Sequence, residues 1–331
     1  SLDQHCNIHN GRQCSDPSPP HDIQWPKSHP PPSVSDFDST FGGYLPPGTS
    51  IISSWGVTRY YEFPPQLGPP KRRIIIIHGG GTCAIGMAPL GFKLAEAGNH
   101  VVIYDIWGHG LSSTPLEAHT PALMHAQLLE LLAHLGWGKA HLLGFSIGGC
   151  IGATFTARHP EAVESFVNIA GAGLWRRSER SWWDGLVLDG GWGLEGMSRR
   201  KILNFVHGDN PQVSPDWKER MLKGDVDTEP VEKWEREYHK GHVASLVSLW
   251  RCCCYDQHDD YRKLVSGDVP SLVILAEKDG AFPLEFMRKE FSGLDWKGEI
   301  KVVSGATHNV VRSHVKEVVD LVGAFWGSLE K

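Results

Sequence analysis

The stretch Gly144-Phe145-Ser146-Ile147-Gly148 decides how this chain is interpreted. It lies between an apolar run, 141–145, that predicts a strand and a small-residue run, 147–157, that predicts a helix. A serine between the two elements must occupy a sharp turn, and the flanking glycines give that turn room where a Cβ would clash. The turn lifts the serine hydroxyl above the sheet, at the positive amino end of the helix.

Strand and helix signals alternate on both sides of this turn. The run 74–77 consists only of isoleucine and predicts a central strand, and Pro121 after Thr120 marks the start of a long helix. Such alternation predicts an α/β fold, with a mostly parallel central sheet flanked by helices. Two edge strands are expected within 51–63, further strands at 101–105, 163–170, 271–276 and 300–303, and helices at 88–97, 122–135, 283–291 and 314–326.

Two segments depart from this alternation. Residues 1–50 are rich in proline without an apolar period, so we expect an extended N-terminal extension that wraps around or tethers the domain. Residues 172–262 carry helical patterns without strands and hold seven of the 13 tryptophans. An insertion between parallel strands lies above their carboxyl ends, where ligands bind. We therefore predict a helical lid over a core formed by 51–171 and 263–331.

Composition excludes several classes of protein. The 331 residues contain 32 Lys and Arg against 38 Asp and Glu, a net charge of −6, which argues against nucleic acid as a partner. No run approaches the roughly 20 apolar residues of a membrane span. Seven cysteines and no Asn-x-Ser/Thr acceptor favour a reducing, cytoplasmic location. The sequence begins at Ser1 rather than Met, and in a secreted protein Cys6 and Cys14 would close a small loop.

Further motifs follow the predicted strands. They are His78-Gly79-Gly80-Gly81, the run 105–112 (DIWGHGLS), the run 274–279 (ILAEKD) and Gly305-Ala306-Thr307-His308. Together with the serine turn, and in this order, they resemble the α/β-hydrolase fold family over residues 50–331. The order nucleophile, acid, histidine along the chain is the one that this fold uses.

The candidate catalytic residues are Ser146, His308 and Asp279. A serine hydroxyl needs an adjacent base to act as a nucleophile, and His308 would take its proton and return it to the leaving group. Asp279 would fix the imidazole tautomer and stabilise the imidazolium. Glu277 is the alternative acid, and His314, inside the predicted final helix, is the alternative base.

Backbone amides are the candidates for stabilising an oxyanion. The N–H groups of Ile147 and of Gly80 or Gly81 would hold the developing negative charge, since glycine allows close backbone approach. Asp105 and His109, in contrast, are interpreted as structural residues that shape the floor of the pocket.

Other polar clusters are weaker candidates for a site. Metal-capable side chains gather at 256–260, but no second cluster at ligand spacing accompanies them, so we expect neither a metal nor a cofactor. The run Cys252–Cys254 lacks C-x-x-C spacing and is expected to pack in a lid helix. We expect the basic residues Arg176, Arg177, Arg180, Arg199, Arg200 and Lys201 to form a solvated lid surface.

These residues predict a cofactor-free serine hydrolase that cleaves a carboxylic ester or lactone through an acyl-enzyme. Trp175, Trp182 and Trp183 follow the strand end at 170 and are expected to wall the mouth above the serine, which favours a bulky apolar small-molecule substrate. One alternative is hydrolysis of a carbon–carbon bond in a β-diketone or vinylogous ketone, although Thr82-Cys83 replaces the Pro-Gly common in that subgroup. Another is a small-molecule receptor, because a fold alone does not settle function.

Overall fold

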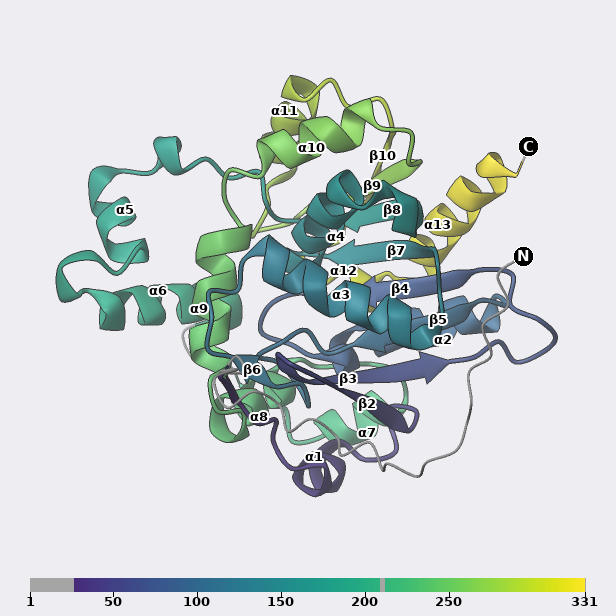
Figure 1. The fold of residues 1–331 in the computed structure, drawn as a ribbon, viewed down its shortest axis with the longest axis horizontal. Coiled ribbons are helices and arrows are strands. Elements are labelled where there is room, and N and C mark those ends of the chain that lie inside the picture. Colours follow the sequence, from purple (N-terminus) through teal and green to yellow (C-terminus); the bar gives the residue numbers. More distant parts are fainter. Residues whose placement is uncertain (1–26, 209–211, 331) are drawn as a thin grey trace, which may run out of the picture.

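A central sheet of eight strands organises the computed structural model, which describes residues 27–208 and 212–330. The strand order is β10-β9-β8-β7-β4-β5-β3-β2 (Figure 1). Pairs from β10 to β5 are parallel, whereas β3 is antiparallel to both β5 and β2. The strands are β2 (Gly48–Ser53), β3 (Gly56–Phe63), β4 (Arg73–Ile77), β5 (His100–Tyr104), β7 (Ala140–Phe145), β8 (Val163–Ile169), β9 (Ser271–Ala276) and β10 (Glu299–Val303). A separate antiparallel pair joins β1 (Ser28–His29) to β6 (Thr114–Pro115).

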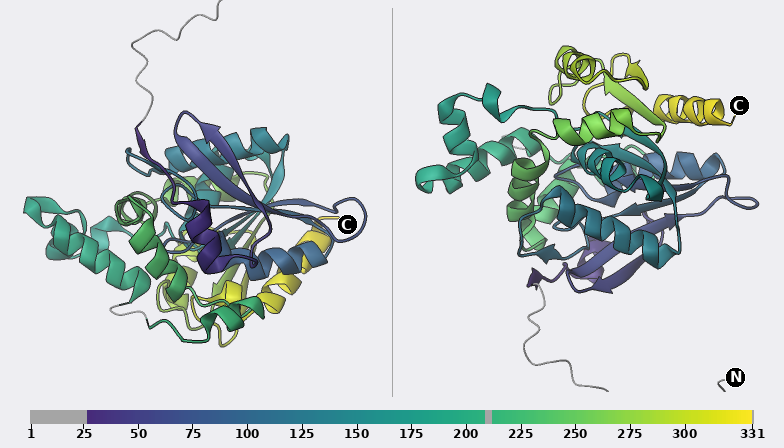
Figure 2. Two further views of the ribbon diagram at one scale, coloured as in Figure 1. Left: turned by 90° about the horizontal axis from the view of Figure 1, so that it is seen from below. Right: turned by 45° about the horizontal axis from the view of Figure 1, so that its top comes forward.

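Helices cover both faces of the sheet, as Figure 2 shows in its left-hand view. One face carries α3 (Pro121–Leu135) and α4 (Ile147–Arg158), and the other carries α2 (Ala88–Glu96) and α13 (Val315–Leu329). This arrangement follows from the sequence, because parallel strands joined by helical crossovers must be buried on both sides. The four isoleucines of β4 are accordingly inaccessible to solvent. The α/β fold class is thus confirmed.

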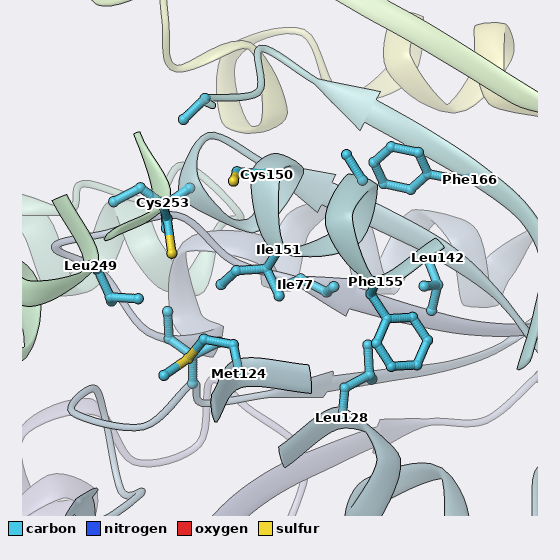
Figure 3. Close-up of a cluster of buried hydrophobic side chains, with 14 of the residues drawn as sticks. Ile77, Met124, Leu128, Leu142, Cys150, Ile151, Phe155, Phe166, Leu249 and Cys253 are labelled. Carbon is cyan, nitrogen blue, oxygen red and sulfur yellow. The ribbon is translucent and has the colours of Figure 1, made fainter. Parts of the chain in front are cut away.

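Two apolar cores fill the space between the sheet and its helices. Figure 3 shows the core beneath α3 and α4, where Ile77 and Leu142 of the sheet meet Met124 and Phe155. Leu249, from a helix far along the chain, joins the same core. The inserted segment is therefore anchored to the domain by shared apolar packing.

The segment 172–262, which we call the insertion, is helical as predicted. It contains α5 (Trp182–Leu188), α6 (Glu195–His207), α7 (Trp217–Leu222), α8 (Glu229–Tyr238), α9 (His242–Cys253) and the start of α10 (His258–Ser266), with short 3-10 turns between them. Figure 1 shows α5 and α6 projecting from the body beyond α9. Helix α9 contacts α4, and α10 packs on α4 more extensively, so these two helices tie the insertion to the core. No helix in the described part of the chain has both the length and the apolar character needed to cross a membrane.

The described part of the N-terminal extension, residues 27–50, contains a helix where we predicted extended chain. Residues 34–41 form the helix α1 (Val34–Phe41), whose Phe37 and Phe41 are buried. Both rings pack against Trp234 of α8, at centroid distances of 5.2 and 6.0 Å. The prediction failed because these two phenylalanines are too few to give a periodic signal, and distant indoles complete their core. Cys6 and Cys14 lie outside the described residues.

Two smaller expectations are also corrected. Of the two predicted edge strands, only β2 lies at an edge, because β3 is inserted between β2 and β5. His314 lies at the junction of α12 (Val310–Ser313) and α13 rather than inside a helix. The helix predicted at 283–291 is present as α11 (Leu284–Gly293), which contacts β9.

Candidate active site

A sharp turn between β7 and α4 positions Ser146. Its backbone φ of 55° and ψ of −121° lie in a region that non-glycine residues rarely adopt. The neighbouring glycines make the turn possible. A Cβ on Gly148 would lie 2.2 Å from the carbonyl oxygen of Ile77, and a Cβ on Gly144 would lie 2.3 Å from the carbonyl oxygen of Gly148. The turn thus fixes the serine above the carboxyl end of β7, at the amino end of α4.

Two more loops bring His308 and Asp279 to this serine. His308, after β10, places its Nε2 3.1 Å from the Ser146 hydroxyl oxygen and its Nδ1 2.9 Å from a carboxylate oxygen of Asp279. Asp279, after β9, is buried and also accepts hydrogen bonds from the backbone N–H groups of Ala281 and Phe282. A carboxylate can only accept, so Nδ1 carries the proton and Nε2 is left to accept from the serine hydroxyl. This is the arrangement that nucleophilic catalysis by serine requires.

The alternative acid and base do not reach the serine. Glu277 accepts hydrogen bonds from the Gly305 N–H and the Ser304 hydroxyl, at 2.6 and 3.0 Å. The first of these bonds lowers the pKa of Glu277, so the carboxylate supports the loop that carries His308. His314 lies beside the hydroxyl of its neighbour Ser313, at 2.9 Å.

Of the three backbone amides expected to hold an oxyanion, two belong to residues that border the cavity beside Ser146. These residues are Gly80 and Ile147, and Ile147 is the first residue of α4, where an N–H has no acceptor within the helix. The N–H of Gly81 instead donates to Nε2 of the buried His109, at 3.3 Å. The structure therefore brings Gly80 and Ile147 together at the serine and directs the amide of Gly81 elsewhere.

Buried polar groups hold the glycine loop in place. His78 lies within hydrogen-bonding distance of the Gly79 carbonyl through Nδ1, and its Nε2 accepts from the N–H of Ile106. Burial lowers the pKa of His78 to about 4, so the ring stays neutral, as this pair of bonds requires. Asp105 accepts from the N–H of Leu111, and burial raises its pKa to about 6. Asp105 and His109 thus both accept hydrogen bonds from backbone N–H groups, and neither of them borders the cavity formed by the described residues.

The cavity at Ser146 is small, with a volume of about 100 Å³, and is lined by side chains of two kinds. Aromatic rings come from both the core and the insertion: Phe145, Phe205, Trp250 and Phe282. Polar side chains contribute as well: Thr82, Thr228, Glu232, Asn309 and Arg312. The site can therefore receive a ligand that is apolar over part of its surface and polar or charged elsewhere.

The tryptophans expected at the mouth occupy other positions. Trp182 and Trp183 are 69% and 52% exposed and contact each other, so neither belongs to the cavity wall formed by described residues. Trp175 packs behind the wall, with its ring 5.2 Å from that of Trp250. The prediction relied on the short distance in sequence between these tryptophans and the end of β8. The 3-10 turn at 177–179 precedes α5, which projects away from the body of the domain (Figure 1).

Sequence reasoning missed Trp250, Phe205 and Arg312 as lining residues. Trp250 was counted among the insertion's tryptophans, but nothing local distinguishes it from the others. Arg312 follows His308 by four residues, and a search of the loop after the last strand for further polar groups would have found it.

The weaker candidates form ion pairs within the domain. Asp260 pairs with Arg158 at 2.6 Å, and His258 pairs with the buried Glu290 at 2.8 Å. Arg176 binds the same glutamate, at 2.8 Å. Within 27–208 and 212–330, no group of three or more His, Cys, Asp or Glu side chains has the arrangement of a metal site.

Comparison with known proteins defines the family. A family model described as alpha/beta hydrolase fold matches residues 72–314, well over half of the chain. The chain belongs to this family. Its sheet order, its serine turn and the positions of Asp279 and His308 after β9 and β10 agree with that membership.

Individual relatives resemble shorter parts of the chain. Proline iminopeptidase of Clostridium botulinum is 32% identical over 130 residues, which are 37% of this chain and 43% of that protein. The 2-hydroxy-6-oxononadienedioate/2-hydroxy-6-oxononatrienedioate hydrolase of Klebsiella pneumoniae is 32% identical over 108 residues, 31% of this chain and 38% of that protein. The chain therefore spans less than half the length of these curated relatives.

A solved structure shows the likeness of fold over a greater length. The enol-lactonase of Burkholderia xenovorans has a TM-score of 0.61 and 19% identity, and the match covers 84% of this chain and all of that one (100%). At this identity the likeness concerns the fold alone. Fold and family together place the chain among proteins of the alpha/beta hydrolase fold.

Proposed function

We propose that the protein is a serine hydrolase of carboxylic esters or lactones that works through an acyl-enzyme. One observation carries the proposal: the hydrogen-bonded series Asp279, His308 and Ser146, with distances of 2.9 and 3.1 Å. A receptor has no need of a strained serine backbone beside an imidazole that a carboxylate orients, so this series favours turnover over binding alone.

The geometry supports the following steps. The Ser146 oxygen attacks the ester carbonyl carbon while His308 Nε2 takes the hydroxyl proton. The N–H groups of Ile147 and Gly80 would stabilise the oxyanion of the tetrahedral intermediate. When the intermediate collapses, the carbon–oxygen bond to the alcohol breaks, and the departing oxygen takes the proton from Nε2. A water molecule then repeats the sequence on the acyl-enzyme and releases the acid.

The helical insertion completes the proposed site as a lid. Phe205 and Trp250 come from α6 and α9, whereas Phe145 and Phe282 come from the core. Rings from both parts enclose one cavity, and aromatic walls of this kind favour an apolar acyl group.

Hydrolysis of a carbon–carbon bond is a second candidate. The likeness to the 2-hydroxy-6-oxononadienedioate/2-hydroxy-6-oxononatrienedioate hydrolase favours this candidate, because the two sequences are 32% identical over 108 residues. Comparing turnover of a panel of esters and lactones with turnover of a β-diketone would separate the two candidates. Faster turnover of the diketone would assign the carbon–carbon reaction.

Labelling with a fluorophosphonate tests the proposed function directly. We expect the parent protein to be labelled and Ser146→Ala to remain unlabelled. The same substitution should lower kcat by on the order of 10⁴-fold or more. Ser292→Ala, which removes an exposed hydroxyl on α11, serves as the matched control and should keep both. Full turnover by a folded Ser146→Ala protein would contradict the serine mechanism.

A further inference from the structure

One charged side chain that borders the cavity has no ion-pair partner among the described residues. Arg312, on α12, borders the same cavity as Ser146 and is half-buried. Its Nη2 donates to the side-chain oxygen of Asn309, a neutral acceptor, and its Nη1 is buried without a hydrogen-bond partner. None of the ion pairs formed by described residues includes this guanidinium.

Three acidic residues act on Arg312, namely Glu232, Glu229 and Asp227, but none of them forms an ion pair with it. Glu232 lies 2.9 Å from Nδ1 of His207, and Asp227 lies 2.7 Å from a guanidinium nitrogen of Arg220. Burial lowers the pKa of Arg312 to about 10, although these carboxylates act in the opposite direction. The side chain is therefore still a cation at neutral pH, and no described carboxylate lies within ion-pair distance of its guanidinium.

A buried cation without a counter-ion is costly, and such a group persists where a ligand supplies the missing charge. A guanidinium presents its donors in a planar fork that matches the two oxygens of a carboxylate. We propose that the substrate carries a carboxylate that pairs with Arg312 while its ester carbonyl lies at Ser146. This inference rests on the proposed function and adds a substrate class to it, namely esters or lactones with an anionic group.

The lining of the cavity fits such a substrate, because it contains both aromatic and polar side chains. The hydrocarbon part would contact rings such as Trp250 and Phe205, and the carboxylate would lie beside Arg312 and Asn309. Glu232 also borders the cavity, and one of its carboxylate oxygens lies 2.9 Å from Nδ1 of His207. Arg312 has no ion-pair partner among the described residues and has a buried Nη1 that lacks an acceptor, so its fork of donors favours an anion.

Two esters that differ in one charge test the proposal. They are p-nitrophenyl hydrogen glutarate, which carries a carboxylate, and p-nitrophenyl methyl glutarate, which is neutral. We expect kcat/KM of the parent to be at least tenfold higher for the charged ester. Arg312→Gln should lower kcat/KM at least ten times more for the charged ester than for the neutral one, chiefly through KM, and Arg312→Lys should restore part of the loss.

Arg288→Gln is the matched control, because Arg288 is exposed on α11 and pairs only with Glu285 among the described residues. It should leave both esters unaffected. Equal losses for both esters in Arg312→Gln, or a parent that prefers the neutral ester or an ester bearing an ammonium group, would overturn the proposal. If Arg312→Gln does not fold, the ratio of kcat/KM for the charged and the neutral ester in the parent protein tests the proposal by itself.

A binding experiment separates this proposal from the proposed function. In Ser146→Ala, the dissociation constants of the same two esters are measured by quenching of tryptophan fluorescence. We expect the charged ester to bind at least tenfold tighter, a preference that Arg312→Gln removes. If this holds while the parent hydrolyses neither ester, the carboxylate site stands and the hydrolase assignment fails. If both esters are hydrolysed but bind equally, the carboxylate site fails and the hydrolase assignment stands.

Discussion

The sheet and the insertion contribute to the cavity in different ways. Ser146, Asp279 and His308 each follow the carboxyl end of a strand, at β7, β9 and β10, and parallel strands end at the same edge of the sheet. The rings of Phe205 and Trp250 come from helices, whose facing side depends on what packs behind them. The comparison teaches that sheet topology positions the candidate catalytic side chains, whereas helix packing determines which rings line the cavity.

Among the residues that follow the strands, we expect the loss of the Asp279 charge, which orients His308, to have the largest effect on kcat. Asp279→Asn can no longer accept the Nδ1 proton, so we expect kcat for an ester to fall by on the order of 10³-fold or more. Glu277→Gln, two residues away, should lower it by less than about tenfold, because Glu277 only supports the loop. The reverse order of the two kcat values would reassign the acid.

Filling the serine turn should damage the core far more than a similar change in the insertion. Gly148→Ala places a Cβ 2.2 Å from the Ile77 carbonyl oxygen, and we expect a loss of about 3 kcal/mol or more in the free energy of unfolding. Gly196→Ala, on α6, meets nothing within 4 Å and should be neutral or stabilising by up to about 1 kcal/mol. Denaturation in urea measures both, and equal losses would refute the contrast.

Acid should weaken the joint between the two regions. His242 of α9 bonds the Gly108 carbonyl of the core, with Nδ1 and the oxygen 2.9 Å apart, and its ring packs 4.7 Å from that of His109. Burial lowers the pKa of His242 to about 3 from its usual value of 6.5. The unfolded chain therefore binds a proton that the folded protein refuses, so stability present above pH 6.5 is lost as the pH falls below it.

This single group should account for about 2 kcal/mol of the stability lost between pH 7 and 5. In His242→Gln the loss over that interval should be smaller by the same amount, as measured by urea denaturation at both pH values. The buried carboxyl of Glu235, 3.7 Å from His242, has its pKa raised by burial. Its titration acts in the opposite direction in both proteins and cancels in the comparison. An unchanged loss in the variant would show that the joint does not respond to pH through His242.

The smallest predicted effects concern the tryptophans of the insertion. Trp250→Leu should lower kcat/KM for a phenylacetyl ester by about tenfold relative to an acetyl ester, because one aromatic wall is lost. The double replacement Trp182→Ala with Trp183→Ala should change neither value by more than about twofold, since both rings are largely exposed. If the double replacement had an effect as large as that of Trp250→Leu, Trp182 or Trp183 would have to contact the substrate.

Local patterns were sufficient for the sheet and for the three candidate catalytic side chains. Continuous apolar runs such as that of β4 have few alternatives to a buried strand, and the glycines around Ser146 meet a steric demand that extends over a few residues. The choice of Asp279 over Glu277 also rested on a local feature, its position in the loop beyond the strand. Three-dimensional packing then brought the imidazole of His308 within hydrogen-bonding distance of the Asp279 carboxylate.

The sequence by itself therefore determined the order of the elements and the groups that follow the strands, because these depend on interactions between near neighbours in the chain. Only the tertiary structure decided that α1 packs on Trp234, that Trp182 faces solvent while Trp250 faces the cavity, and that Arg312 forms no ion pair with another described residue. Each of these outcomes depends on residues far apart in sequence. Burial and charge compensation are properties of the surroundings that folding assembles, and no single segment encodes them.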